Sequence, residues 1–386
     1  MDPKLQHPSD EERHATSSSI ADSPYESAEK RPEHEHHSFD WFLVGPHGLR
    51  VGWSILLFYL MYHLFRIIVG TIFYSAGLIG ETSDDSASSV IIAELIPFIS
   101  MVGAALVMAF VEGRRISSYN LAGPRRAWHF LSGTAAGFAV LSLLVGTLAL
   151  RGWLSLGPSA LSGAQALRFG ALWAFAFLVV GAFEEGLFRC YLLFTLARGV
   201  SFWWALAAEI AICLYLFVTG GGHGAWGVYA IAGLGILPCL TLHNRSTACS
   251  GFWQAAWVTS TVFAFYHTNN NGENWIGVFA AGAIGFVFCV SVRLTGSAWW
   301  AIGCHTAWDW AETFFYGTAD SGMQGQGHYL SASPAGNSLW SGGADGPEGS
   351  LLVLGAILLL LLALLLFHGR RKLKASASLV AEQGAG

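Results

Sequence analysis

The sequence predicts an all-α membrane protein, a polytopic bundle of about ten transmembrane helices. Hydrophobic side chains make up 53% of the 386 residues and charged side chains only 12%, about half of the share usual in a soluble domain. The charges are also unevenly spread, because residues 1–51 hold 15 of them and the much longer stretch 52–368 holds only 25. Apolar runs long enough to cross a bilayer recur along that stretch. This composition excludes a disordered protein, a nucleic-acid binder and an ordinary soluble enzyme.

The N-terminal tail, residues 1–50, is rich in Ser, Pro, Glu and His and shows no apolar period, so we expect it to be disordered. After the tail come the apolar segments that we expect to span the bilayer as helices. A hydrocarbon core of about 30 Å needs about 20 residues of helix. The predicted spans are 52–77, 89–111, 128–150, 169–197, 202–219, 224–242, 250–268, 275–292, 297–316 and 350–368.

The chain is thereby divided into five parts. They are the tail at 1–50, N-terminal transmembrane helices at 51–124, a membrane core at 125–316 that includes a hairpin at 202–242, a Gly/Ser-rich exterior loop at 317–349, and a last helix with a basic tail at 350–386. We expect the loop to be flexible because of its composition.

The positions of Lys and Arg predict the orientation of the helices. With the N-terminus inside, sixteen of these residues fall on the cytoplasmic side, and only Arg151 and Arg168 fall outside. Cytoplasmic loops of membrane proteins carry such an excess of positive charge. We therefore expect an integral, multi-pass membrane protein with both termini in the cytoplasm.

Ionisable residues inside the predicted spans are candidates for function. An ionised group at the bilayer centre costs about 2.5–3.5 kcal/mol on insertion scales, so each needs a partner or a purpose. For four of them a paired structural charge is as good an interpretation as a functional one. These four are Arg66, Glu94, Glu209 and Glu312; the others are Glu184, Glu185, Arg189 and Asp309.

The motif Glu184-Glu185-xxx-Arg189 combines two adjacent carboxylates with one guanidinium. Glu185 and Arg189 are four residues apart and share a helix face, which favours an ion pair. Glu184 is rotated by about 100° from Glu185 and points elsewhere. The pair would therefore be structural, while Glu184 would face a cavity, where a carboxylate without a cation is suited to act as a general base.

Two further helices supply imidazoles. Phe263 and His267 are four residues apart, so the phenyl ring can pack beneath the histidine on one face. His305 and Asp309 have the same spacing, so the carboxylate can orient the imidazole or join it at a common ligand. One carboxylate base with two histidines and an acceptor can activate water against an amide, either directly or around Zn²⁺. The sequence has no HExxH helix and no GxSxG elbow, so nucleophilic serine chemistry has no support.

These motifs resemble those of the CPBP family of intramembrane proteases, which includes type II CAAX prenyl endopeptidases and the Abi-like bacteriocin-processing and self-immunity proteins. The family pattern is EExxxR, then FxxxH, then HxxxN or HxxxD, and the resemblance covers residues 125–316. It implies that Glu184 and His267 activate the water and that His305 and Asp309 stabilise the oxyanion. The family is described both as zinc-dependent and as metal-free, so Zn²⁺ at Glu184, His267, His305 and Asp309 stays open. A bacterial plasma membrane is the location that the resemblance implies.

One departure from the family pattern concerns spacing. In relatives, the EExxxR helix is usually followed directly by the FxxxH helix, whereas here the apolar spans 202–219 and 224–242 lie between them. We interpret these as a hairpin inserted into an eight-span family core. Two added spans leave the orientation of the later helices unchanged, but they can reshape the path by which a substrate enters.

The favoured function is therefore an intramembrane endopeptidase. Its substrate would be a membrane-embedded or membrane-anchored peptide or protein in the lipid bilayer, prenylated or CAAX-like, and no nucleic acid would be involved. The alternative from another class is a non-proteolytic membrane scaffold or self-immunity protein of the same fold. A transporter ranks last, because no inverted repeat of the usual kind is detectable.

Overall fold

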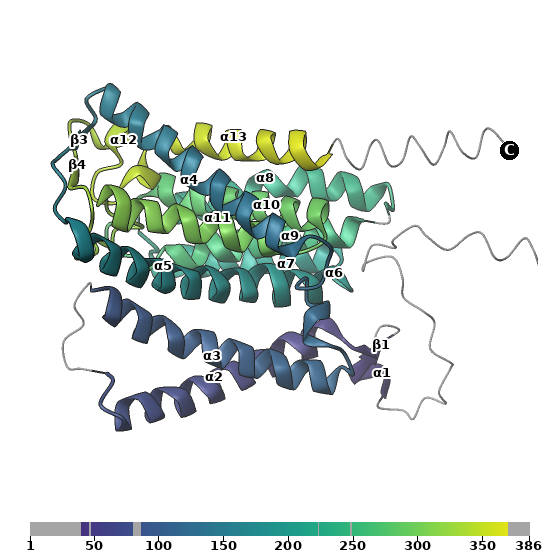
Figure 1. The fold of residues 1–386 in the computed structure, drawn as a ribbon. Helices are drawn as coiled ribbons and strands as arrows, with labels where there is room; N and C mark the ends of the chain where they lie inside the picture. The colour runs from purple at the N-terminus through teal and green to yellow at the C-terminus, as the bar shows by residue number, and fades with distance from the viewer. Residues whose placement is uncertain (1–39, 46–47, 80–85, 223, 248, 370–386) are drawn as a thin grey trace, which may run out of the picture.

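The structure is a computed structural model, and it describes residues 40–45, 48–79, 86–222, 224–247 and 249–369. Long helices dominate it (Figure 1). They are α2 (Val51–Ser75), α3 (Ala87–Val111), α4 (Arg126–Leu150), α5 (Gly163–Glu185), α7 (Phe202–Thr219), α8 (Ala225–Asn244), α9 (Ser250–His267), α10 (Trp275–Thr295), α11 (Trp299–Trp310) and α13 (Val353–Leu364).

Short elements connect and extend these helices. The helical ones are α1 (Asp40–Leu43), η1 (Ile116–Ser118), the π-helical η2 (Gly186–Leu192), α6 (Leu193–Ala197), the π-helical η3 (Ala311–Tyr316), α12 (Ser338–Ser341), η4 (Pro347–Gly349) and the π-helical η5 (Leu365–Gly369). Two small antiparallel ribbons pair β1 (Val44–Gly45) with β2 (Gly48–Leu49) and β3 (Leu154–Leu156) with β4 (Ala332–Pro334).

The predicted all-α bundle is confirmed. Each of the ten predicted spans is helical, and the fourth is a continuous helix of 35 residues, Gly163–Ala197, because η2 and α6 continue α5. Seven of the described helices are long and apolar enough to cross a membrane. Within the tail 1–50 that was predicted to be disordered, α1, β1 and β2 are ordered elements between residues 40 and 49. Residues 1–39 and the basic tail at 370–386 lie outside the described residues, and the cytoplasmic location of the termini stays a prediction.

The helices differ in how much of their surface the bundle covers. In the most apolar 18-residue stretch of α10, 67% of the residues are buried, whereas in the corresponding stretch of α2 only 6% are buried. Helix α2 lies at the margin beside α3 (Figure 1) and exposes large apolar side chains such as Ile67 and Ile72. A helix that is apolar on all sides yet exposed is suited to contact lipid. The functional groups are therefore expected near α10, at the centre.

Helices α4 and α11 cross at very short distance because small residues face each other. A Cβ atom on Gly133 or Gly137 of α4 would collide with backbone carbonyl oxygens of α11, and one on Gly303 of α11 would collide with the carbonyl of Phe130. Small residues that let backbones approach are the usual means of packing helices in lipid, where the hydrophobic effect does not drive association. This contact fixes the helix that carries His305.

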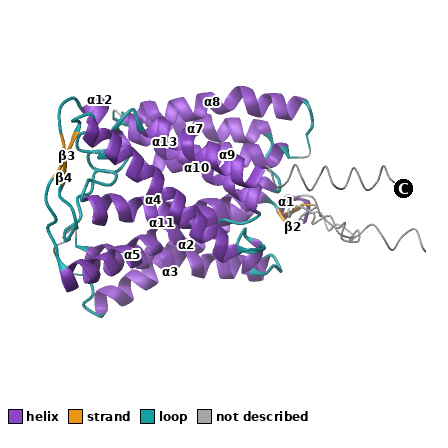
Figure 2. Ribbon diagram, turned by 45° about the horizontal axis from the view of Figure 1, so that its top comes forward, coloured by secondary structure: helices purple, strands orange, loops and turns teal. Residues whose placement is uncertain are grey.

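The loop 317–349 differs from its prediction as a flexible segment. It packs against one end of the bundle, where its strand β4 pairs with β3 and its short helix α12 lies (Figure 2), and it buries Thr318, Ser341 and Asp345. The carboxylate of Asp345 accepts a hydrogen bond from the backbone N–H of Asn274 at 3.0 Å. Glycine-rich composition predicted flexibility, but tertiary contacts to the start of α10 hold the loop in place.

Candidate active site

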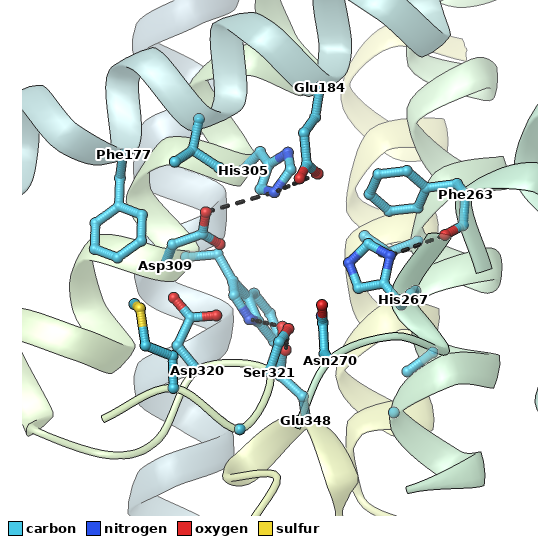
Figure 3. Close-up of a pocket in the computed structure, with 18 of the residues that line it drawn as sticks. Phe177, Glu184, Phe263, His267, Asn270, His305, Asp309, Asp320, Ser321 and Glu348 are labelled. Carbon is cyan, nitrogen blue, oxygen red and sulfur yellow. Dashed lines mark hydrogen bonds and ion pairs between the residues drawn. The ribbon is translucent and has the colours of Figure 1, made fainter. Parts of the chain in front are cut away.

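A cavity of about 570 Å³ lies within the bundle, and five of the seven predicted site residues line it. Its wall comes from α3, α5, α9, α10, α11, α13 and the loop 317–349. Figure 3 shows labelled side chains of α5, α9, α11 and the loop directed into one space. The five are Glu184, Phe263, His267, His305 and Asp309; the two others, Glu185 and Arg189, lie behind the wall.

Glu185 and Arg189 form the ion pair that their spacing predicts. The Nε–Oε2 distance is 3.1 Å, and both side chains are completely buried. Three aromatic rings surround the guanidinium, the nearest being Phe263 at 4.3 Å from its carbon to the ring centroid. Cations over aromatic faces are stabilised further when they are desolvated. The pair and its aromatic cage therefore form a rigid support behind the cavity.

His305 lies between three carboxylates. Its Nδ1 is 2.9 Å from Oε1 of Glu185, and its Nε2 lies 3.7 Å from Oε2 of Glu184 and 3.4 Å from Oδ2 of Asp309. A carboxylate only accepts hydrogen bonds, so Nδ1 carries a hydrogen and donates to Glu185. The sequence predicted that Asp309 orients His305 or joins it at a common ligand. In the structure Asp309 and Glu184 flank the nitrogen that faces the cavity, and Glu185 holds Nδ1, a contact that the spacing did not predict (Figure 3).

His267 lies at the end of α9, across the cavity from Asp309 (Figure 3). Its Nδ1 donates a hydrogen bond to the carbonyl oxygen of Phe263 at 2.8 Å, so the neutral imidazole carries its hydrogen on Nδ1. The unprotonated Nε2 faces the cavity and can act as a base or as a metal ligand. The Phe263 ring packs against the imidazole as its spacing predicts, at 4.6 Å between ring centroids. The FxxxH spacing thus fixes both the position and the tautomer of the histidine.

Comparison with known proteins finds one family that resembles part of the chain. A family model described as type II CAAX prenyl endopeptidase Rce1-like matches residues 239–311, a segment that holds Phe263, His267, His305 and Asp309. Over this segment the chain is similar to the type II CAAX prenyl endopeptidases. The predicted resemblance is thereby confirmed for this segment, and the family is one of intramembrane proteases, which are hydrolases. No curated protein and no solved structure matches the chain.

The whole EExxxR motif, Glu184, Glu185 and Arg189, lies outside the matched segment, yet the fold joins its two glutamates to that segment. Glu184 and Glu185 end α5, about 55 residues before the match begins, and both contact His305 within the segment. The π-helical turn η2 starts directly after them, and η3 starts two residues after Asp309. Such π-helical turns are often found at functional sites.

The residues present fit a zinc ion in their donor chemistry. Both imidazoles direct Nε2 to the cavity while Nδ1 is held by an acceptor, which is the arrangement in which metal-ligating histidines are usually supported. With Glu184 and Asp309 they offer two nitrogen and two carboxylate ligands. Among the described residues, the ligand atoms of these four side chains do not all lie within 4.8 Å of one another. Binding of a zinc ion would therefore require the four side chains to move closer together.

Several cavity residues were not assigned to the site from the sequence. Glu94 of α3 lines the cavity, although the sequence marked it only as a buried charge without an assigned role. Asp320, Ser321 and Glu348 come from the loop 317–349, and Asn270 follows α9. No local pattern connects these residues to the motifs, and only the absence of Lys and Arg from the loop hinted at an unusual electrostatic environment.

Carboxyl groups of the loop 317–349, and Glu273 in the turn between α9 and α10, are shifted toward their neutral form. Burial raises the pKa of Asp345 to about 8 and that of Glu273 to about 10, and neighbouring carboxylates add to both shifts. Burial also raises the pKa of Asp320 and of Glu348 above their ordinary values. Desolvation disfavours the charged form of any carboxyl group. The end of the bundle next to the cavity is thus rich in acidic groups that lack a basic partner within the loop.

Proposed function

We propose that this protein is an intramembrane endopeptidase that hydrolyses a peptide bond of a membrane-associated, prenylated or CAAX-like substrate. The observation that carries the proposal is the convergence of Glu184, His267 and His305 from three different helices in one cavity. The family supports the class of reaction. The apolar side chains in the same wall, among them Val180, Ile284 and Phe288, would accommodate the apolar part of the substrate.

In the proposed mechanism Glu184 accepts a proton from a water molecule that attacks the scissile carbonyl, and Nε2 of His267 positions that water from the opposite side. His305, held through Nδ1 by Glu185, donates a hydrogen bond from Nε2 to the developing oxyanion, and Asp309 stabilises the positive charge of the imidazolium. Glu184 then returns the proton to the leaving amine. The ion pair of Glu185 with Arg189 acts through His305 and is a positioning element.

A zinc ion, when bound by Glu184, His267, His305 and Asp309, would polarise the carbonyl as a Lewis acid and lower the pKa of a bound water. The steps assigned above to these side chains concern their own proton transfers and hydrogen bonds. Metal content of the purified protein, compared with that of a Glu184→Gln variant, tests whether these residues hold zinc.

The test of the proposed activity uses the full chain in lipid vesicles and a quenched fluorescent peptide that ends in a farnesylated CAAX sequence. We expect Glu184→Gln and His267→Ala to lower the cleavage rate by about 10²-fold or more, because general base catalysis contributes on that order. The unprenylated peptide measures how much the lipid group contributes.

A matched control is Glu209→Gln, which neutralises a buried glutamate of α7 that lies outside the cavity. We expect this variant to cleave at the rate of the unmodified protein. Cleavage at the full rate by Glu184→Gln would contradict the proposed role of Glu184. If expression of the Glu184→Gln variant restores the normal phenotype of cells that lack the protein, the non-proteolytic scaffold is favoured instead.

A further inference from the structure

A second group of carboxylates lies beside the cavity and has no part in the proposed hydrolysis. It consists of Glu312 in η3, Asp320 in the loop 317–349 and Glu348 in η4, and we call it the acidic cluster. One oxygen from each of the three lies within 4.8 Å of those of the other two. Figure 3 shows Asp320 and Glu348 on the side of the cavity next to Asp309.

Glu312 is the member of the acidic cluster that most needs a partner. Its side chain is completely buried, and neither carboxylate oxygen has a hydrogen-bond partner in the described residues. The ion pairs found with arginine in the described part of the chain involve Glu112 and Glu185, not the cluster. An unpaired buried carboxylate is costly, and buried charges are normally paired or bind a metal.

The other two carboxylates are held by hydrogen bonds from their surroundings. Glu348 accepts from Nε1 of Trp308 at 2.8 Å and from the hydroxyl of Ser321 at 2.9 Å, and Asp320 accepts from the hydroxyl of Thr313 at 3.1 Å. These donors fix the direction of each carboxylate but leave lone pairs free. Hydrogen-bonded carboxylates of this kind are typical of metal ligands.

We propose that Glu312, Asp320 and Glu348 bind a divalent cation that prefers oxygen ligands, Ca²⁺ or Mg²⁺. Ca²⁺ binds oxygens at about 2.3–2.6 Å and Mg²⁺ at about 2.0–2.1 Å, so ligand atoms on opposite sides of either ion lie about 4–5 Å apart. The three cluster oxygens, which all lie within 4.8 Å of one another, are close enough to share one such ion. An all-oxygen set favours these ions over zinc, which is usually bound through nitrogen or sulfur.

The bound cation would fasten the loop 317–349 to the helix that carries the HxxxD motif. Glu312 belongs to the continuation of α11, three residues after Asp309, whereas Asp320 and Glu348 lie near the two ends of the loop. Asp320 and Glu348 also line the cavity. The cation would therefore fix the shape of the cavity wall, whether or not the protein cleaves peptides.

The experiment measures thermal unfolding of the full chain in detergent, stripped of metal with a chelator and then titrated with Ca²⁺, Mg²⁺ or Zn²⁺. At a concentration about 100 times the dissociation constant, we expect Ca²⁺ or Mg²⁺ to raise the unfolding temperature by about 5 °C. Terbium emission excited through tryptophan provides a second readout, because Trp308 donates to Glu348.

Variants distinguish the acidic cluster from the candidate active site. Glu312→Gln and Asp320→Asn should each abolish the temperature rise and the terbium emission, and Glu312→Gln should not destabilise the metal-free protein, because it removes an unpaired buried charge. Glu184→Gln and Glu209→Gln should keep the response. No rise with Ca²⁺ or Mg²⁺, a rise with Zn²⁺ alone, a rise that persists in both cluster variants, or its loss in Glu184→Gln would each overturn the proposal.

Discussion

Two adjacent glutamates, Glu184 and Glu185, occupy different environments although they are chemically identical. Glu185 is completely buried and contacts both Arg189 and His305, whereas Glu184 faces the cavity. The helical rotation of about 100° between neighbours separates the two roles. At this scale one carboxylate is a structural partner and the other is free to react.

Glu185→Gln should therefore destabilise the protein far more than Glu184→Gln. Removing Glu185 leaves the buried guanidinium of Arg189 without its counter-ion, and breaking a buried ion pair from one side typically costs about 3–5 kcal/mol. Denaturant or thermal unfolding in detergent measures the difference, with Glu184→Gln as the matched neighbour. Equal stability of the two variants would contradict the assignment of Glu185 as the structural partner.

At the scale of elements, the crossing of α4 and α11 determines where His305 lies. The residue before it, Cys304, has its carbonyl oxygen against the Cα of Gly137, so no side chain fits between the helices at that point. Because both contacting groups are backbone, neither can move aside by changing a rotamer. The position of the imidazole thus depends on a glycine in another helix.

Gly137→Ala should lower stability by about 1–3 kcal/mol or more, the usual cost of overpacking, and should reduce the proposed cleavage activity by displacing α11. Gly146→Ala in the same helix is the control, because a Cβ there has no neighbour within 4 Å. Alanine at that position should be neutral or stabilising by up to about 1 kcal/mol. Unfolding temperature and cleavage rate of both variants check the expectation.

On the scale of the whole molecule, the loop 317–349 closes one end of the bundle and adds its carboxylates to the cavity wall. Asp345 connects the loop to the start of α10 through the N–H of Asn274, and its other oxygen, Oδ1, has no partner in the described residues. With its pKa raised to about 8 by burial, this carboxyl group is protonated in the folded protein at neutral pH.

The stability of the metal-free protein should consequently fall as the pH rises. The carboxyl group of Asp345 has a pKa near 3.8 in the unfolded chain and about 8 in the folded protein. Its contribution to the free energy of unfolding is therefore fully present below about pH 4 and is lost progressively as the pH rises to about 8. Asp345→Asn, which mimics the neutral group, should match the unmodified protein at pH 4 and exceed it at pH 8, by an amount on the order of a few kcal/mol.

Unfolding temperatures at several pH values in the presence of a chelator measure this effect. Glu273, Asp320 and Glu348 face the same region and also have raised pKa values, so the variant should reduce the pH dependence without removing it. An identical pH profile for Asp345→Asn and the unmodified protein would contradict the prediction.

The sequence by itself determined the bundle and the local pairs within it. Hydropathy predicted all ten helical spans, because a bilayer requires each span to be long and apolar. The spacing of four residues predicted the contacts of Glu185 with Arg189 and of Phe263 with His267, because helical geometry alone brings such residues together. These features depend only on residues that are near one another in the chain.

Only the tertiary structure decided which distant residues share the cavity. Three features depend on how the helices rotate and cross. Glu185, rather than Asp309, holds Nδ1 of His305, and Glu94 lines the same cavity wall. The glycine-rich loop also places Asp320 and Glu348 beside Glu312. Those angles are set by close contacts between backbones, such as that of Gly137 with Cys304. Such contacts join residues far apart in sequence and leave no periodic signal in it.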